Sequence, residues 1–546
     1  IQGGSSKSFV DDYLRKYKQH TNYNSINVYA TYNKDFGNHH FKVMAGFNQE
    51  SSYQETLDTY SYNQAVLDVP AMSSGTGTIK ATDSYSEYAI RGGFFRVNYN
   101  YLDKYLLEVN GRYDGSSKFP KSSRFGFFPS VSAGWQIAQE RFMNSTRHWL
   151  DGLKLRASYG VIGNQNINPY TFTPSMSVNN KATSWIIDDT YVTSISSLPA
   201  LVSQNFTWEK VGTINVGLDV NLFNNRLSGV FEWYQRNTNG MLAPGVQLPA
   251  VVGASAPYQN TADMRTRGWE LSLNWRDQIG KVGYRIGFNL SDYKSEIIKY
   301  DDNAATKLLS SYYPGQTLGE IWGYVVDGYY TVDDFVDTSS WQLKEGVTSI
   351  NGYNVRPGDV KFKNLRDDDT STNVITSGDN TFDNPGDRKV IGNTTPRYQY
   401  GINLGMNYAG FDLNVILQGT GKRDYWISNV LTFPMNGDNF VPLFEGLSDY
   451  WMPKDPDNGD WSAVNPNAKY PRIYGNRGNS GSNLRQSDKY LSDASYLRIK
   501  NITLSYKLPK KWVNQIFLNQ MKAFVSIENV ATFTSLPSGC LLYTSD

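Results

Sequence analysis

The sequence predicts an all-β protein, specifically a transmembrane antiparallel β-barrel. Three observations support this prediction. Apolar and polar residues alternate over segments of about ten residues, a pattern typical of strands with one apolar face. Short and long connections alternate along the chain. Only 19% of residues are charged although the mean hydropathy is −0.50, so Asn, Ser, Thr, Tyr and Gly supply the polarity. A polar barrel interior accounts for that composition.

The alternating segments come in pairs that each predict a hairpin. In one pair, Phe95–Tyr101 carries apolar residues at every second position, and the pattern restarts in Tyr105–Val109 after a tight turn. About seven such hairpins give about 14 strands. The other six pairs are Val28–Tyr32 with Phe41–Phe47, Val131–Ile137 with Leu153–Val161, Ile214–Leu222 with Leu227–Trp233, Trp269–Trp275 with Tyr284–Leu290, Tyr398–Tyr408 with Phe411–Leu417, and Ile502–Leu508 with Met521–Ile527.

The connections between hairpins are far longer than those within them. A usual connection has a median of about 4–6 residues. Because long and short connections alternate, all short turns lie at one end of the strands and all long loops at the other. This asymmetry predicts short periplasmic turns and long extracellular loops. The predicted loops are 51–92, 115–126, 162–206, 239–266, 293–397 and 421–495.

Other protein classes fit less well. A soluble all-β protein also alternates, but sandwich strands average about five to six residues and soluble loops are mostly short. A propeller would repeat every ~40–50 residues, and no such period is present. The charges nearly cancel, with 52 Lys and Arg against 51 Asp and Glu, which argues against nucleic-acid binding. The single Cys540 excludes a disulfide framework and a cysteine metal site.

Several segments, in the correct order along nearly the whole chain, resemble the SusC/RagA-type TonB-dependent outer-membrane transporters. The resemblance implies a 22-strand barrel filled by an N-terminal plug. We therefore expect an internal or C-terminal barrel fragment that lacks the plug and the last strand. The matching segments are YLDKYLLEVNGRYDGSSKFP (101–120), RFGFFPSVSAGWQIAQERFM (124–143), WLDGLKLRASYGVIGNQNI (149–167), RGWELSLNW (267–275), PGDVKFKNL (357–365), VIGNTTPRYQYGINLGMNYAGFDLNVILQGT (390–420), LSDASYLRIKNITLSYKLP (491–509) and SIENVATFT (526–534).

The expected domain organisation has two parts. Residues 1–534 are assigned to a partial TonB-dependent receptor barrel domain, and 535–546 to a tail that does not look native. Within that tail, CLLYTSD (540–546) looks like translated sequencing-adapter DNA. The start at Ile1 shows no signal peptide, so a fragment or a mature piece is expected.

The family resemblance implies import rather than catalysis. The expected ligand is an oligosaccharide or peptide, and the expected partners are a SusD-like surface lipoprotein, TonB–ExbB–ExbD acting through the plug, and outer-membrane lipid. No nucleotide-binding or hydrolase motif is present, so no enzyme activity and no cofactor are expected. The alternative hypothesis is a secreted soluble β-rich protein that binds or cleaves glycans.

Aromatic residues are numerous in the two longest loops. Tyr and Trp faces can stack on sugar rings or grip peptides, and they can equally pack the loops together or contact a partner. Both interpretations stay open from the sequence. The candidate ligand or partner contacts are Trp322, Tyr324, Tyr329, Tyr330, Trp451 and Trp461.

No metal site is assigned. His39 and His40 are adjacent, and neighbouring side chains on extended backbone point to opposite faces. The acidic segment 356–387 lacks the glycine and terminal Glu of an EF-type loop, which favours a solvated acidic loop over a calcium site. Strand acids are expected to line the lumen rather than to form a catalytic pair: Glu108, Asp219, Glu232 and Glu270.

Overall fold

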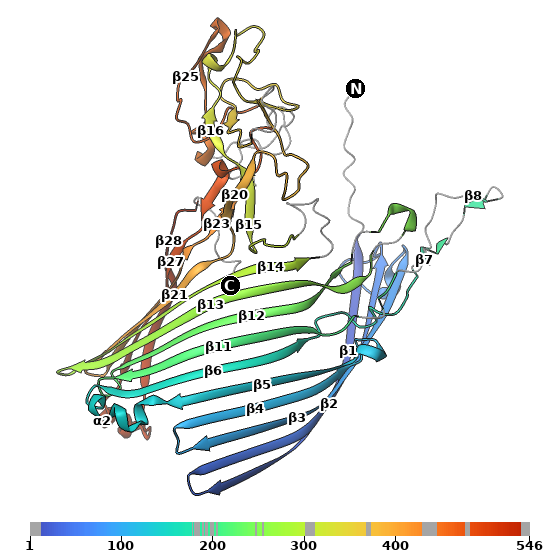
Figure 1. Cartoon of the computed structure of the whole chain (residues 1–546). Coiled ribbons are helices and arrows are strands. Elements are labelled where there is room, and N and C mark those ends of the chain that lie inside the picture. The colour runs from blue at the N-terminus through green and yellow to red at the C-terminus, as the bar shows by residue number, and fades with distance from the viewer. Residues whose placement is uncertain are drawn as a thin grey trace. The chain divides into compact units, whose positions relative to one another are not determined.

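The computed structural model describes most of the chain (Figure 1). The described residues are 12–176, 178–179, 186–187, 190–191, 195–196, 201–203, 206–245, 248–253, 256–300, 312–366, 373–427, 445–474 and 481–536. Among them, no helix combines the length and the apolar character needed to cross a membrane.

One antiparallel sheet of fourteen strands contains most of the regular structure, which confirms the predicted fold class and strand number. Sequential strands are neighbours throughout the sheet order. The strands are β1 (Tyr13–Phe36), β2 (His39–Tyr62), β3 (Ile79–Tyr101), β4 (Tyr105–Ser116), β5 (Phe125–Gln136), β6 (Leu150–Asn164), β11 (Glu209–Leu222), β12 (Leu227–Pro244), β13 (Tyr258–Ile279), β14 (Val282–Tyr300), β21 (Arg397–Tyr408), β22 (Phe411–Lys422), β27 (Tyr496–Lys507) and β28 (Lys522–Thr534).

The remaining elements lie in the connections. The connections before β21 contain ten short strands among the described residues: β7 (Val178–Asn179), β8 (Ile186–Ile187), β9 (Thr190–Tyr191), β10 (Ile195–Ser196), β15 (Glu320–Tyr324), β16 (Val326–Tyr329), β17 (Ser349–Ile350), β18 (Val360–Phe362), β19 (Val374–Ile375) and β20 (Arg388–Asn393). Further along the chain are β23 (Asp424–Trp426), β24 (Pro453–Asp455), β25 (Asp460–Ala463), β26 (Leu491–Asp493) and the short helix α2 (Lys510–Val513).

Several strands are much longer than the predicted ten residues, and the prediction was wrong on this point. β1 and β2 each contain 24 residues. At about 3.3 Å per residue such a strand extends about 80 Å, whereas about 9–11 tilted residues cross a bilayer. Hydrogen-bonded pairing therefore continues well beyond the membrane. The loop expected at 51–92 shrinks to 63–78, because β2 and β3 remain paired from His39↔Tyr101 to Ser61↔Ile79.

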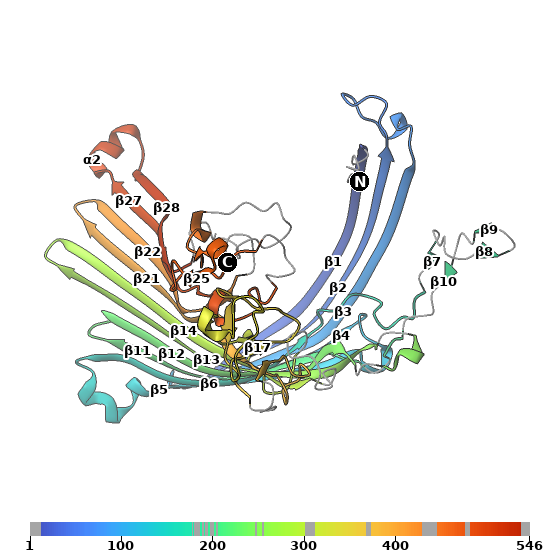
Figure 2. The same ribbon diagram turned by 90° about the horizontal axis from the view of Figure 1, so that it is seen from above.

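The chain divides into two compact units. The first comprises 1–134, 158–212 and 238–260, and the second comprises 135–157, 213–237 and 261–546. In the first unit, β1 to β4 lie side by side (Figure 2). In the second, β13, β14, β21, β22, β27 and β28 follow one another in the sheet.

The strand registers separate an apolar face from a polar face. In the first unit Val97 lies opposite both Val43 and Val109. In the second, Leu404 lies opposite Ile286 and Val415. These apolar rows are largely uncovered, and Leu404 is 38% exposed. A long uncovered apolar row on a sheet is expected where lipid is the solvent.

The polar face is formed by the intervening residues. Asn274 lies opposite Gly287, and Gly287 lies opposite Asn403. These three positions alternate with apolar residues such as Leu273, which faces Phe288. The predicted alternation of apolar and polar residues therefore holds across these strands, and the assignment of the apolar face to lipid stays a prediction.

Candidate functional site

The two longest connections fold together into one structured unit, here called the loop domain. It comprises residues 312–366, 373–396, 423–427, 445–474 and 481–495. Hydrogen bonds join the first connection to the second: the Tyr329 hydroxyl donates to the Ala468 carbonyl at 2.9 Å, and the Val326 N–H donates to the Asp488 carboxylate at 2.9 Å. The loop domain lies at one end of the second unit's long strands (Figure 1).

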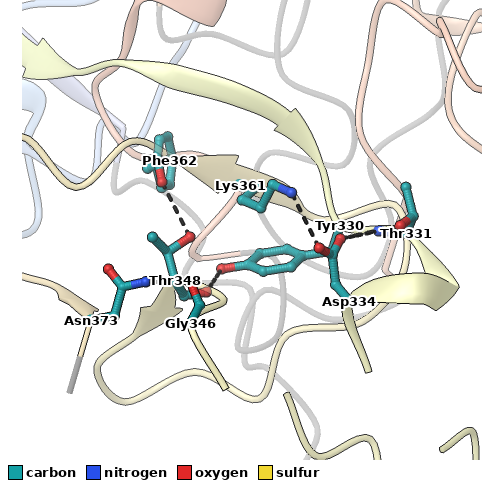
Figure 3. Close-up of polar contacts among 8 residues, drawn as sticks. All are labelled: Tyr330, Thr331, Asp334, Gly346, Thr348, Lys361, Phe362 and Asn373. Atoms are coloured by element: carbon teal, nitrogen blue, oxygen red, sulfur yellow. Dashed lines mark hydrogen bonds and ion pairs between the residues drawn. The ribbon is translucent and has the colours of Figure 1, made fainter. Parts of the chain in front are cut away.

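The loop domain has its own hydrophobic core. Tyr330, Val360 and Phe362 are completely buried there, together with Ile375. The Tyr330 hydroxyl donates to the Thr348 carbonyl at 2.6 Å (Figure 3). Burial raises the pKa of Tyr330 to about 12, so this hydroxyl remains a donor at neutral pH. The core is thus fixed by both packing and directed hydrogen bonds.

Polar contacts tie the edges of this core to its strands. Lys361 lies 3.2 Å from the Asp334 carboxylate, which also accepts a hydrogen bond from the Thr331 N–H at 2.7 Å (Figure 3). The side-chain amide of Asn373 donates to the Gly346 carbonyl at 2.6 Å. These contacts close the chain around Tyr330.

The segment PGDV (357–360) supplies the centre of the loop domain. Gly358 adopts φ +89°, and a Cβ on it would lie 2.3 Å from the Trp451 ring, so only glycine fits both requirements. Asp359 is 1% exposed. Its carboxylate accepts hydrogen bonds from the side chains of Asn483 at 2.9 Å and Tyr474 at 2.7 Å. Residues more than a hundred positions apart therefore meet at this carboxylate.

Burial raises the pKa of Asp359 despite these hydrogen bonds. The folded loop domain consequently binds this proton more tightly than the unfolded chain does. The resulting contribution to stability is full below the unfolded pKa of about 4, and it is lost as pH rises through the higher folded pKa.

Asp359→Ala should destabilise the loop domain strongly. The substitution leaves the Asn483, Tyr474 and Arg356 donors without their acceptor, at about 1–3 kcal/mol for each donor that stays buried and unsatisfied. Hydrogen exchange of loop-domain amides measures the effect. Asp457→Ala, at an exposed position of the same domain, is the control and should change exchange little. Equal protection in both variants would show that Asp359 does not organise the domain.

Four of the six candidate contact residues are buried inside the loop domain. Trp322, Tyr324, Tyr330 and Trp451 are 7%, 6%, 0% and 3% exposed. Their rings pack the loops, which is one of the two interpretations that the sequence left open. Tyr329 and Trp461 are only partly buried. A role for the six residues in binding a ligand or partner stays a prediction.

A row of partly exposed aromatic and cationic groups is the best candidate contact surface. Trp341 and Trp461 meet edge to face with ring centroids 5.0 Å apart. The Arg356 guanidinium lies 5.5 Å from the Trp341 centroid, and the Arg472 guanidinium lies 5.0 Å from the Trp461 centroid. Among the described residues neither guanidinium forms an ion pair. The row thus joins one aromatic pair to two cationic groups.

The two arginines of this row were not predicted from the sequence. Trp461 was a candidate because of its loop position, but Arg356 and Arg472 lie 116 residues apart. No periodicity links residues in two different loops. The available signal in the sequence was the presence of arginines in the same long loops as the aromatic residues.

Three of the four strand acids are paired with Arg or Asn side chains on the polar face. Arg156 bonds Asp219 at 3.1 Å and also contacts Glu232. Glu108 accepts from the Asn110 side chain at 2.7 Å. Glu232 and Glu270 line a hollow of about 270 Å³ on this face of the second unit. Pairing with Arg and Asn fits the expected structural lining.

The expected solvated acidic loop at 356–387 is wrong for two of its acids, because Asp359 and Asp387 are buried and accept hydrogen bonds from the backbone. Asp387 is 1% exposed and accepts from the Leu365 and Thr376 N–H groups at 2.8 and 2.7 Å. The acidic run 367–369 lies outside the described residues. No group of three potential metal ligands gathers among the residues that are described. His39 and His40 contact different partners, Tyr99 and Asp35.

The family was established by comparison with known proteins. Residues 2–530 match the family model described as TonB dependent receptor-like, beta-barrel. The chain belongs to this family. The TonB-dependent receptor barrel is an outer-membrane structure, so the predicted location is confirmed and the soluble alternative is wrong. Members of the family are transporters rather than enzymes.

Relatives of the SusC/RagA kind match nearly the whole chain. TonB-dependent receptor P3 of Formosa agariphila is 29% identical over 542 residues, covering 96% of this chain and 49% of the relative. TonB-dependent receptor SusC of Bacteroides thetaiotaomicron is 27% identical over 509 residues, covering 90% and 45%. The chain thus spans about half the length of these curated relatives.

A solved structure shares the TonB-dependent receptor fold. The RagAB peptide importer in its closed-closed state superimposes with a TM-score of 0.75 at 22% identity, covering 96% of this chain and 53% of that one. The domain boundary expected at 534 remains a prediction, and residues 540–546 lie outside the described part.

Proposed function

We propose that the chain is the barrel wall of a longer outer-membrane importer, called the parent below. The parent takes up oligosaccharides or peptides too large to diffuse through porins, with energy from TonB–ExbB–ExbD acting through a plug. The observation that carries this proposal is the TonB-dependent receptor barrel with relatives of the SusC/RagA kind.

The loop domain supports a role in ligand capture. It is a folded unit with its own core rather than a set of separate loops, and it lies at one end of the strands. Loops on a rigid scaffold are where binding residues concentrate. The Arg356, Trp341, Trp461 and Arg472 row provides a surface for a ligand or for a SusD-like lipoprotein that closes over the loops.

Uptake of labelled oligosaccharide and peptide pools tests this proposal. Cells that lack the parent gene should lose import of one of the two classes, and the restored gene should bring it back. Loss of peptide uptake would assign a peptide importer, and loss of oligosaccharide uptake a glycan importer. Unchanged uptake of both classes would contradict the proposal.

A further inference from the structure

The connection between β27 and β28 is one of two long connections between neighbouring sheet strands at its end of the second unit, the other being 137–149 between β5 and β6. The turns after β13 and β21 contain two residues each, whereas this one runs from 508 to 521. It holds α2 and a following 3-10 turn, η10 (Asn514–Ile516). Hydrogen bonds close it: the Leu508 N–H donates to the Met521 carbonyl at 3.0 Å and the Leu518 N–H to the Val513 carbonyl at 3.2 Å. The connection is therefore a defined structure.

Most of the apolar side chains in this connection are exposed. Val513 is 1% exposed and anchors α2, but its apolar neighbours are uncovered. Phe517 has the left-handed backbone value φ +60°, unusual for an aromatic residue, and its side chain is almost fully exposed. The exposed fractions are 59% for Trp512, 56% for Ile516, 98% for Phe517, 48% for Leu518 and 44% for Met521. Such a cluster is unfavourable in water and needs an apolar surrounding.

The same connection is strongly basic. Lys507, Lys510, Lys511 and Lys522 lie within it or at its borders, and no Asp or Glu occurs from Ser505 to Ile527. None of these four ammonium groups forms an ion pair with any described residue. Trp and Phe beside unpaired Lys are the residues that a membrane interface favours, since the rings enter the acyl boundary and the ammonium groups meet phosphates.

The position of this connection in the fold also suits contact with a membrane interface. α2 lies at the turn end of β27 and β28, at the opposite end of these strands from the loop domain (Figures 1 and 2). It continues directly from the apolar row of Ile502, Leu504 and their partners Ile527 and Val525. With the long loops outside the cell, the turn end meets the periplasmic leaflet, which consists of phospholipid.

We propose that residues 508–521 form an interfacial anchor in the periplasmic leaflet. Trp512, Ile516 and Phe517 insert among the acyl chains, and Lys510 with Lys511 binds the phosphates of anionic phospholipids. The proposal goes beyond import and rests on the membrane position of the barrel and on its long loops lying outside the cell.

Depth-dependent quenching on the purified parent tests insertion. Phe517→Cys, in a background without other cysteines, carries an NBD label in vesicles of phosphatidylcholine and phosphatidylglycerol. Val464→Cys is the control, because Val464 is 56% exposed and lies in the loop domain. Lipids with a nitroxide near the headgroup should quench label 517 at least threefold more than label 464, and iodide should do the reverse.

The lysines are tested with the same label. Removing phosphatidylglycerol, or substituting Lys510→Gln with Lys511→Gln, should raise iodide quenching of label 517 at least twofold. Lys344→Gln with Lys454→Gln, two exposed loop-domain lysines, should change nothing. If iodide quenching of label 517 did not rise in the variant with Lys510→Gln and Lys511→Gln, the proposed binding of these lysines to anionic lipid would be wrong.

Two results would overturn insertion itself. Equal iodide quenching of labels 517 and 464 would place the cluster in water. Protection from iodide without quenching by nitroxide lipid would show that a protein segment covers it. The readout uses purified protein without transport, so failed import in cells would leave it unaffected.

Discussion

Leu273→Arg in the parent lowers the amount of assembled barrel in the outer membrane, whereas Asn274→Arg leaves it near the wild-type level. Leu273 lies in the apolar row opposite Phe288, and Asn274 lies opposite Gly287 on the polar face. A charged Arg on the lipid face near the membrane centre costs about 2–4 kcal/mol, whereas a lumen residue keeps its water. Because the two positions are adjacent, opposite outcomes would separate the effect of the sheet face from the effect of the local sequence.

The measurement is the fraction of protein that migrates faster in an unheated gel than in a heated one, which reports folded barrel. Quantitative blots of outer-membrane fractions give the total. Equal losses in the two variants would show that the faces are assigned incorrectly.

Replacing residues 423–494 by a short glycine-containing turn should leave a heat-modifiable barrel but abolish uptake or binding of the SusD-like lipoprotein, here called the lid. The sheet permits this change, because Thr420 and Tyr496 already lie opposite each other at the ends of β22 and β27. The replacement removes Asn483 and Tyr474, so Asp359 loses two of its hydrogen-bond donors and the first connection loses its partner in the loop domain.

Shortening the 245–257 connection, which lies in the other unit, is the matched control and should preserve lid binding. If the 423–494 variant imports ligand at the parental rate with its lid attached, the loop domain is not the capture surface. The determinants would then lie in the plug or in shorter loops.

The hairpins were predictable because one face of each strand is apolar. Val97 and Leu404 belong to rows in which every second residue is apolar, and this period identifies a strand without tertiary information. The extensions of β1 and β2 beyond the membrane were not predictable in this way. Residues such as Gln54 and Thr21, which lie opposite each other, are polar on both faces and carry no such period.

The interior of the loop domain depends on contacts between distant residues. The sequence shows that the long loops are rich in Tyr and Trp, but it could not separate buried Tyr330 from partly exposed Trp461. Asp359 accepts hydrogen bonds from residues 115 and 124 positions away, and no local sequence pattern predicts such a contact. The segment PGDV was visible as a motif, yet its reason, Gly358 against Trp451, appears only in three dimensions.

The most direct test of import is ligand uptake by cells carrying the parent, measured with TonB intact and with TonB inactivated. We expect saturable uptake that falls to the level of the gene deletion when TonB is lost, while the amount of heat-modifiable barrel in the outer membrane is unchanged. Uptake that continues at the same rate without TonB would contradict TonB-driven import.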